Sequence, residues 1–290
     1  MDVLRYTAFS ADPAGGNPAG VVLDSSGLDE AAMQDIAAQV GYSETAFLRR
    51  RDDGRFDVRY FSPLAEVPFC GHATIATAVA YAQRHGTGEL QLLTAAGPVP
   101  VSTQMSADGL VTATLTSVAP TSKPLSDEDF DELLQALRWS RDDLDPALPP
   151  RVAYAGAWHP IVAAASRERL ADLDYDMARL GELMRRRDWT TVDLVWRESA
   201  SVFHARNPFP PGGVVEDPAT GAAAAAFGGY LRELGLVQAP AVLTIYQGYD
   251  MGRPSTITVT VPAPQESAQE SAQESAQRGG IAVSGTAIAL

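Results

Sequence analysis

Two segments of the chain place a run of very small residues directly after a turn that contains glycine and threonine. They are "PFCGHATIATAVAYAQRHG" at residues 68–86 and "VVEDPATGAAAAAFGGYLRELG" at residues 214–235. A helix of alanine and glycine has little side-chain volume of its own, but it can lie very close to surrounding backbone. Each segment is therefore expected to form a helix enclosed by a curved sheet, and two such helices predict two similar domains.

The order of the flanking elements is the same in both halves of the chain. Short runs of alternating apolar residues bounded by Gly, Pro and Asp predict strands. Apolar residues at helical spacing predict an outer helix at 28–40, ended by Gly41, and a second one that begins at Ser126. A further helical pattern covers 167–187. We therefore predict an α+β protein with two pseudo-repeat domains, each a curved, mostly antiparallel sheet or barrel around a central helix.

The composition changes at the proline-containing segment 118–124, which marks the expected domain boundary. The first domain is expected at 1–118 and the second at 119–279. Within the second domain, residues 265–276 have the sequence "QESAQESAQESA", and this polar repeat predicts a solvated loop to which no function is assigned.

Charge and cysteine content exclude several classes of function. Lys and Arg number 22 against 36 Asp and Glu, which gives a formal charge of -14 and disfavours nucleic acids and anionic lipid surfaces as partners. The basic run at 185–187 is interpreted as a solvated helix end. The single cysteine excludes an intrachain disulfide, and the sequence contains no run of 18 apolar residues. A cytoplasmic protein without a membrane partner is expected.

The starts of the two small-residue helices predict a binding site for a carboxylate. The first backbone N–H groups of a helix have no partner within it, and its N-terminus carries a partial positive charge. Gly71 and Ala73 in one helix, and Gly221 and Ala222 in the other, would bind one carboxylate if the two N-termini face each other across a cleft between the domains. No HxxxH, CxxC, GxGxxG or phosphate-loop spacing occurs, so neither a metal site nor a cofactor is predicted.

Six motifs in order resemble the phenazine-biosynthesis PhzF-like family. They are "GGNPAGVVLD", "YSETAFL", "YFSPLAEVPFCGHATIATA", "EDPATGAAAAA", "YQGYDMGRPS" and "VSGTA". The resemblance covers nearly the whole chain apart from the QESA repeat. It implies the diaminopimelate-epimerase fold, a homodimer, and an interdomain site that transfers protons without a cofactor. It also suggests that the last strand, about 280–290, returns to the first domain. The best-known activity of the family is isomerisation of a dihydro-hydroxyanthranilate ring.

The resemblance assigns roles to three residues, and each has a structural alternative. Glu44 resembles the general base of the family, although most such acids at a strand start are simply solvated. His72 matches the histidine that polarises the substrate or relays a proton, although a single histidine near a helix start is more often structural. Asp217 matches the second acidic residue, or is the N-cap of the second helix, with Pro218 in its first turn. Glu216 is a lesser candidate.

Two further positions bear on the type of activity. In related racemases a cysteine occupies the turn of Cys70 and a second one the position of Asp217, so a symmetric two-thiol racemase is not expected here. Cys70 either lines the site or is a small buried residue. Many family members have serine where this chain has Ala222, and its loss removes a substrate contact. Two hypotheses follow: a cofactor-independent isomerase or epimerase acting on a small carboxylate, or a small-molecule-binding protein with weak or lost catalysis.

Overall fold

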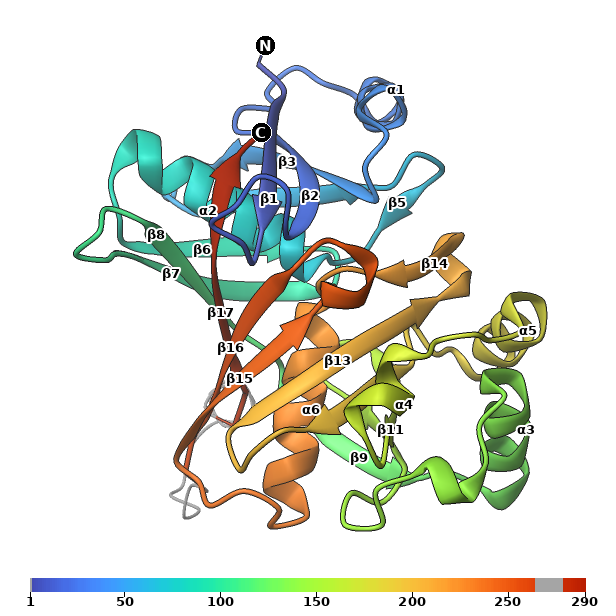
Figure 1. Cartoon of the computed structure of the whole chain (residues 1–290). Coiled ribbons are helices and arrows are strands. Elements are labelled where there is room, and N and C mark those ends of the chain that lie inside the picture. The colour runs from blue at the N-terminus through green and yellow to red at the C-terminus, as the bar shows by residue number, and fades with distance from the viewer. Residues whose placement is uncertain (1, 264–278) are drawn as a thin grey trace, which may run out of the picture. The chain divides into compact units, whose positions relative to one another are not determined.

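The computed structural model describes residues 2–263 and 279–290, so the QESA repeat lies outside the described residues. The chain divides into two compact units, shown in Figure 1. Unit 1 comprises Met1–Thr116, Arg253–Thr256 and Val283–Leu290. Unit 2 comprises Ser117–Gly252 and Ile257–Ala282.

The strands of unit 1 form a closed ring. Its members are β1 (Leu4–Ala8), β2 (Asn17–Val22), β3 (Glu44–Arg50), β4 (Phe56–Phe61), β6 (Glu89–Thr94), β7 (Gly97–Met105), β8 (Val111–Thr116) and β17 (Ala282–Ala289). They pair in this order, and β17 closes the ring by pairing with both β8 and β1. The β2–β3 and β4–β6 pairs are parallel. The short strand β5 (Glu66–Val67) pairs with β4.

Helix α2 (Gly71–His85) contacts β1, β2, β3, β7 and β8 of this ring, and Figure 1 shows it among those strands. Eleven of its fifteen residues are buried, which is far more than one face of a helix. The small side chains of this segment are therefore what allows it to be enclosed by the strands, as expected from the sequence.

Helix α1 (Glu30–Val40) packs Met33 and Ala37 against strand residues of unit 1. The Asp29 side chain caps its N-terminus by accepting a hydrogen bond from the Ala32 N–H, and Gly41 ends it in the left-handed conformation at φ 72°. The predicted end of this helix is thus confirmed.

The strands of unit 2 pair in the order β9, β10, β11, β12, β13, β15. Strand β14 also pairs with β13, at a bulge. The bounds are β9 (Thr121–Pro124), β10 (Arg151–Tyr154), β11 (Trp158–Ala163), β12 (Asp193–Arg197), β13 (Val202–Phe209), β14 (Val214–Asp217) and β15 (Ala241–Gln247), followed by β16 (Ser255–Val261). Short 3-10 helices lie at Arg141–Asp143, Pro210–Gly212 and Tyr249–Met251.

Helix α6 (Gly221–Glu233) contacts β9, β10 and β11, and ten of its thirteen residues are buried. Its glycines are needed for close approach. A Cβ atom added at Gly229 would lie 2.3 Å from Pro120 Cβ, and one at Gly228 would lie 2.8 Å from Val259 Cγ1. Larger residues cannot occupy these positions without a shift of the neighbouring strands.

Helices α3 (Asp127–Leu137) and α5 (Met177–Arg187) cover one face of the unit 2 strands with an apolar cluster that includes Leu133, Leu183 and Val162. Ser126 caps α3 as predicted. The prediction of one continuous helix over 167–187 is wrong. The structure has α4 (Arg167–Ala171), then a break, then α5, because the Asp176 side chain accepts a hydrogen bond from the Arg179 N–H and starts a new helix.

Among the described residues, no helix combines the length and the apolar character that a membrane span requires.

Candidate active site

Glu44 is the first residue of β3, in the strand ring of unit 1. Strand β3 pairs with β2 on one side and β4 on the other, so its backbone is fixed along both edges. The Glu44 side chain is 13% exposed. The carboxyl group is therefore held on a rigid strand and is largely removed from water.

The turn before α2 brings His72 and Cys70 to this carboxyl group. Cys70 is the N-cap residue of α2, and its side chain makes no capping hydrogen bond. His72 is 6% exposed, and its Nε2 atom lies 3.4 Å from Glu44 Oε2. The Cys70 Sγ atom lies 3.3 Å from His72 Nδ1 and 3.8 Å from Nε2. Residues far apart in sequence thus form one compact polar cluster within unit 1.

Asn17 and Ser43 also lie beside the His72 ring. Asn17, the first residue of β2, places its Nδ2 atom 3.2 Å from His72 Nδ1. An amide nitrogen donates, so a neutral ring that accepts this hydrogen bond at Nδ1 carries its proton on Nε2. That nitrogen faces the Glu44 carboxyl group and also lies 3.4 Å from Ser43 Oγ. Sequence reasoning did not single out Asn17, although it belongs to the motif "GGNPAGVVLD".

Burial raises the pKa of the Glu44 carboxyl group above its usual value, and hydrogen bonds with Ser43 and Cys70 oppose this shift. A carboxylate with a raised pKa binds a proton more strongly than a solvated one does. This is the property that a general base needs in order to take a proton from carbon. The solvated alternative for Glu44 is not what the structure shows.

The start of α2 is buried from Cys70 to Thr74. Thr74 Oγ1 donates to the Cys70 carbonyl group at 2.6 Å and lies 2.6 Å from the Tyr60 hydroxyl group. The first turn of the helix is therefore fixed from two sides. The backbone N–H groups of Gly71 and Ala73 belong to this turn, where intrahelical partners are lacking.

Asp217 is the last residue of β14 and is 8% exposed. Its Oδ2 atom accepts a hydrogen bond of 2.6 Å from Thr220 Oγ1. Thr220, not Asp217, is the N-cap residue of α6, and the helix begins at Gly221. The interpretation of Asp217 as the N-cap with Pro218 in the first turn is therefore wrong, because Pro218 precedes the helix by three residues.

Gln247, the last residue of β15, holds the Asp217 turn in place. Its Nε2 atom donates to the Asp217 carbonyl oxygen at 2.7 Å and to Thr220 Oγ1 at 3.0 Å, and its Oε1 atom accepts from the Thr220 N–H at 3.0 Å. Gln247 is 2% exposed. Sequence reasoning did not single out Gln247, although it is the second residue of the motif "YQGYDMGRPS". Ala222 is the second residue of α6 and is half-buried.

Glu216 lies on the opposite face of β14 from Asp217, because successive side chains of a strand alternate. It pairs with the Arg206 guanidinium group of β13, whose Nε donates to Glu216 Oε2 at 2.9 Å and whose Nη2 donates to Oε1. Arg206 also donates to the Ala171 carbonyl oxygen at 2.6 Å. The ion pair therefore links β13 to β14, the strand that carries Asp217.

A chain of buried hydrogen bonds connects β11, β12 and β13. His159 Nδ1 lies 2.9 Å from Thr191 Oγ1, which donates to Asn207 Oδ1 at 2.9 Å. Asn207 Nδ2 in turn donates to Asp193 Oδ1 at 3.1 Å. Burial lowers the pKa of His159 to about 4 and raises that of Asp193 to about 7. Asn207 is also the register partner of Asp217 on β14.

His204 is the remaining histidine of unit 2. Its Nε2 atom lies 2.6 Å from Glu198 Oε2, and its ring lies near Trp196 and Tyr246. These contacts fit a structural role for His204.

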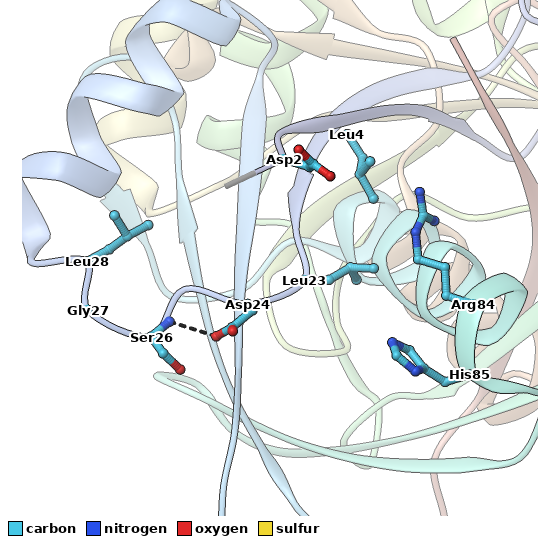
Figure 2. A pocket seen from close by; sticks show the side chains of 9 residues that line it. All are labelled: Asp2, Leu4, Leu23, Asp24, Ser26, Gly27, Leu28, Arg84 and His85. Carbon is cyan, nitrogen blue, oxygen red and sulfur yellow. Dashed lines mark hydrogen bonds between the residues drawn. The ribbon is translucent and has the colours of Figure 1, made fainter.

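A surface groove lies at the other end of α2 from His72. Figure 2 shows its lining, which includes Asp2, Asp24, Arg84 and His85. A helix rises 1.5 Å per residue, so Arg84 lies roughly 18 Å along α2 from His72. The groove contains none of the site residues predicted from the sequence.

The family model described as "Phenazine biosynthesis-like protein" matches residues 6–290. The chain belongs to this family. It is 32% identical over 265 residues to the uncharacterized isomerase YfhB of Bacillus subtilis, with 89% of each chain covered. It is also 32% identical over 251 residues to trans-2,3-dihydro-3-hydroxyanthranilate isomerase of Pseudomonas fluorescens, with 86% of each covered. The resemblance seen in the six sequence motifs is therefore confirmed. The prediction of an isomerase is also confirmed, because these relatives are named isomerases.

Solved structures support the same assignment. A PhzF-family phenazine biosynthesis protein of Bacillus anthracis matches with a TM-score of 0.85 and 26% identity, covering 100% of this chain and 98% of that one. A probable proline racemase of Agrobacterium radiobacter matches with a TM-score of 0.67 at 14% identity, covering 99% and 90%, which shows a shared fold alone. The expected epimerase-like fold of this phenazine biosynthesis-like protein is confirmed.

Proposed function

We propose that this protein is an isomerase that moves a proton from one carbon atom to another in a small carboxylate substrate, without a cofactor. The observation that carries the proposal is the Glu44 carboxyl group, which is buried on a rigid strand and lies beside the His72 ring. Membership in a family of named isomerases supports the reaction type. The named activity of the Pseudomonas fluorescens relative supports an unsaturated ring acid as the first candidate substrate.

The proposed reaction removes one proton from the substrate and returns one proton to it. The Glu44 carboxylate takes a proton from a carbon next to an unsaturated group and becomes a carboxylic acid, and the electron pair of the C–H bond moves into the conjugated system. A proton then returns to a different carbon, which restores the carboxylate. The substrate changes the position of a double bond, and no oxidant, reductant or second substrate is consumed.

His72 is suited to stabilise the negative charge of the intermediate. With Asn17 donating to Nδ1, the proton of the neutral ring lies on Nε2, the nitrogen next to Glu44. A positioned N–H donor in a buried site stabilises developing charge more strongly than water does. The second acid–base candidate is Asp217, which is buried and fixed by Thr220 and Gln247.

The start of α2 in unit 1 and the start of α6 in unit 2 are each proposed as a binding position for a carboxylate group. Both helices begin with small residues, Gly71 and Ala73 in one and Gly221 and Ala222 in the other. A carboxylate can approach backbone N–H groups at such positions without a clash with long side chains. Helix N-termini are established binding sites for anions.

The second candidate function is binding of the same class of molecule with little turnover. The observation that favours it is Ala222, which has no hydroxyl group where many family members have serine. A missing hydrogen bond to the substrate costs about 1 kcal/mol. The Ala222→Ser variant separates the two functions, because it would raise the turnover of an enzyme but would not create turnover in a protein that only binds.

The experiment is proton NMR in D2O with dihydro-hydroxyanthranilate and a panel of small cyclic and amino carboxylates. Wild-type protein is expected to place deuterium on carbon in one member of the panel and to convert it to an isomer. Calorimetric titration of the protein with the same compounds measures binding, for comparison with the turnover seen by NMR. Suppose that a compound binds tightly, and that both the wild type and Ala222→Ser fail to exchange or isomerise it. That result would reject the isomerase and favour the binding function.

A further inference from the structure

The turn between β1 and β2 is held by a segment from near the other end of the chain. Arg253 lies 237 positions after Gly16, and both residues belong to unit 1. The Arg253 Nε atom donates to the Gly16 carbonyl oxygen at 2.9 Å, and Nη2 donates to the Gly15 carbonyl oxygen at 2.8 Å. The Pro254 carbonyl oxygen accepts a hydrogen bond from the Gly16 N–H at 3.0 Å. The motifs "GGNPAGVVLD" and "YQGYDMGRPS" are therefore in direct contact.

This contact requires glycine at both positions of the turn. A Cβ atom added at Gly15 would lie 2.5 Å from the Pro254 carbonyl oxygen, and one at Gly16 would lie 2.4 Å from the Ala8 carbonyl oxygen. Gly16 also has the left-handed conformation, at φ 70°. A larger residue at either position would push the two backbone segments apart.

The start of the same turn has a strained backbone. Phe9 has φ 63°, which is uncommon for any residue other than glycine. Its N–H donates to the Thr286 carbonyl oxygen at 2.7 Å, and its carbonyl oxygen accepts from the Thr256 N–H at 2.8 Å. Such a conformation persists only where the surrounding structure holds it. The turn is therefore fixed at its start by backbone contacts and at its end by Arg253.

The Arg253 guanidinium group makes no ion pair with any residue that the structure describes. It bonds to the two glycine carbonyl groups, and its Nη2 atom also donates to Thr7 Oγ1 at 3.4 Å. The donors of a guanidinium group lie in one rigid plane, so two of them can bind two neighbouring carbonyl groups at once. Arg206, by contrast, pairs with the Glu216 carboxylate. The contacts of Arg253 therefore fix the direction of a backbone segment.

Asn17 directly follows this segment and carries its position into the candidate active site. It is the first residue of β2 and is 2% exposed. Its Nδ2 atom lies 3.2 Å from His72 Nδ1, and His72 Nε2 lies 3.4 Å from Glu44 Oε2. A shift of the Gly16 backbone would move Asn17, and with it the group that contacts the His72 ring.

We propose that Arg253 is a positioning residue for the candidate active site, which fixes Asn17 against the His72 ring by holding the carbonyl groups of Gly15 and Gly16. The effect of Arg253 on turnover rests on the proposed function, because only in that case does the placement of the His72 ring affect the rate. The effect of Arg253 on the ring itself does not depend on that function.

The first test is the nitrogen-15 NMR spectrum of protein labelled at histidine, with no compound added. The chain has four histidines, and the His72→Gln variant identifies the resonances of His72. Asn17→Ala is expected to shift these resonances, because the amide beside Nδ1 is lost. Arg253→Gln should shift them in the same direction. The double variant should show the shift of Asn17→Ala and no more.

Arg151→Gln is the matched control. Arg151 lies in unit 2, where its Nε atom donates to Ser122 Oγ at 2.6 Å and its Nη2 atom donates to the Ser122 carbonyl oxygen at 3.0 Å. This variant removes a guanidinium group with similar contacts and should leave the His72 resonances unchanged. If Arg253→Gln does not fold, the comparison is made with Arg253→Lys, because an ammonium group cannot reproduce the planar fork.

The second test is turnover of the compound that the wild type isomerises. Arg253→Gln is expected to lower kcat by about 10–100-fold, because a small misplacement of a catalytic group by a distant residue costs this much. In an Asn17→Ala background the same change should lower kcat by less than about 2-fold, since the two residues act through one contact. If the wild type turns over no compound, the proposed function fails, but the NMR comparison still decides the role of Arg253.

Three results would overturn the proposal. Wild-type His72 resonances in folded Arg253→Gln would show that the guanidinium group does not position the ring. Unchanged resonances in Asn17→Ala would show that Asn17 does not act on the ring. Effects of the two substitutions that simply add in the double variant would show that Arg253 acts on another part of the molecule.

Discussion

The Asp193 carboxyl group is expected to make the stability of unit 2 depend on pH near neutrality, and Asp193→Asn is expected to remove this dependence. Asp193 is 2% exposed, and its Oδ1 atom accepts a hydrogen bond from Asn207 Nδ2. Burial raises its pKa to about 7, and the bond from Asn207 only partly opposes the shift. In the unfolded chain the pKa is about 3.9.

The sign of the effect follows from these two values. A carboxyl group with a raised pKa in the folded state contributes stability that is fully present below pH 4 and is lost as the pH rises towards 7. Each pKa unit corresponds to about 1.4 kcal/mol, so the full loss is about 4 kcal/mol, of which about 3 kcal/mol falls between pH 5 and pH 8. Asparagine keeps the Oδ1 acceptor and has nearly the shape of the protonated acid.

The assay is urea unfolding of wild type and Asp193→Asn at several pH values, followed by tryptophan fluorescence. All four tryptophans belong to unit 2, at positions Trp139, Trp158, Trp189 and Trp196. The signal therefore reports the unit that contains Asp193. At each pH, the free energy of unfolding of the wild type is subtracted from that of the variant. The contributions of the other titrating groups cancel, because both proteins contain them.

The expected result is a variant whose advantage in stability grows by about 3 kcal/mol between pH 5 and pH 8. A difference that stays constant over this range would refute the reasoning. It would mean that Asp193 ionises in the folded protein as easily as in the unfolded chain. The Asn207 amide and the surrounding strands would then not exclude water from the carboxyl group.

Two further predictions concern the supports of Asp217. Gln247→Ala removes the hydrogen bonds that Gln247 makes with the Thr220 N–H and the Asp217 carbonyl group, and should lower the free energy of unfolding by about 1–3 kcal/mol. Hydrogen exchange at the Thr220 amide should accelerate, whereas the exposed-site control Gln238→Ala should leave both quantities unchanged. Glu216→Ala removes the carboxylate that pairs with the buried Arg206 guanidinium group, and should lower the free energy of unfolding by about 3–5 kcal/mol. The double variant Arg206→Met/Glu216→Leu should recover most of this loss, as measured by urea unfolding. A double variant no more stable than Glu216→Ala would contradict the ion-pair argument.

The parts of the fold that local chemistry controls could be predicted from the sequence. Gly41 and Ser126 mark helix ends because a left-handed residue and a side-chain cap act within one turn. The small residues of α2 and α6 predict that strands surround these helices for a similar reason. Whether neighbouring strands can approach a helix closely depends on the size of its own side chains. The break at Asp176 was missed because the apolar pattern continues across it, while a single carboxylate starts the next helix.

The site could be predicted only where the family motifs reach it. Glu44, His72 and Asp217 have roles that the family motifs imply. Asn17 and Gln247 also lie in family motifs, but their roles depend on tertiary hydrogen bonds. Gln247 bonds to a residue 30 positions away, and Asn17 to one 55 positions away. No local pattern contains that information, because it depends on which strands become neighbours in the folded chain.

The most direct test of the central claim is the initial rate of deuterium incorporation at carbon by wild type, Glu44→Gln and Glu89→Gln, with the compound that the wild type turns over. If Glu44 is the base, Glu44→Gln should be slower by about 10²–10⁴-fold, the usual contribution of a positioned acid–base group. Glu89→Gln, which changes an exposed glutamate at the start of β6, should match the wild type. Exchange by folded Glu44→Gln at the wild-type rate would contradict the account.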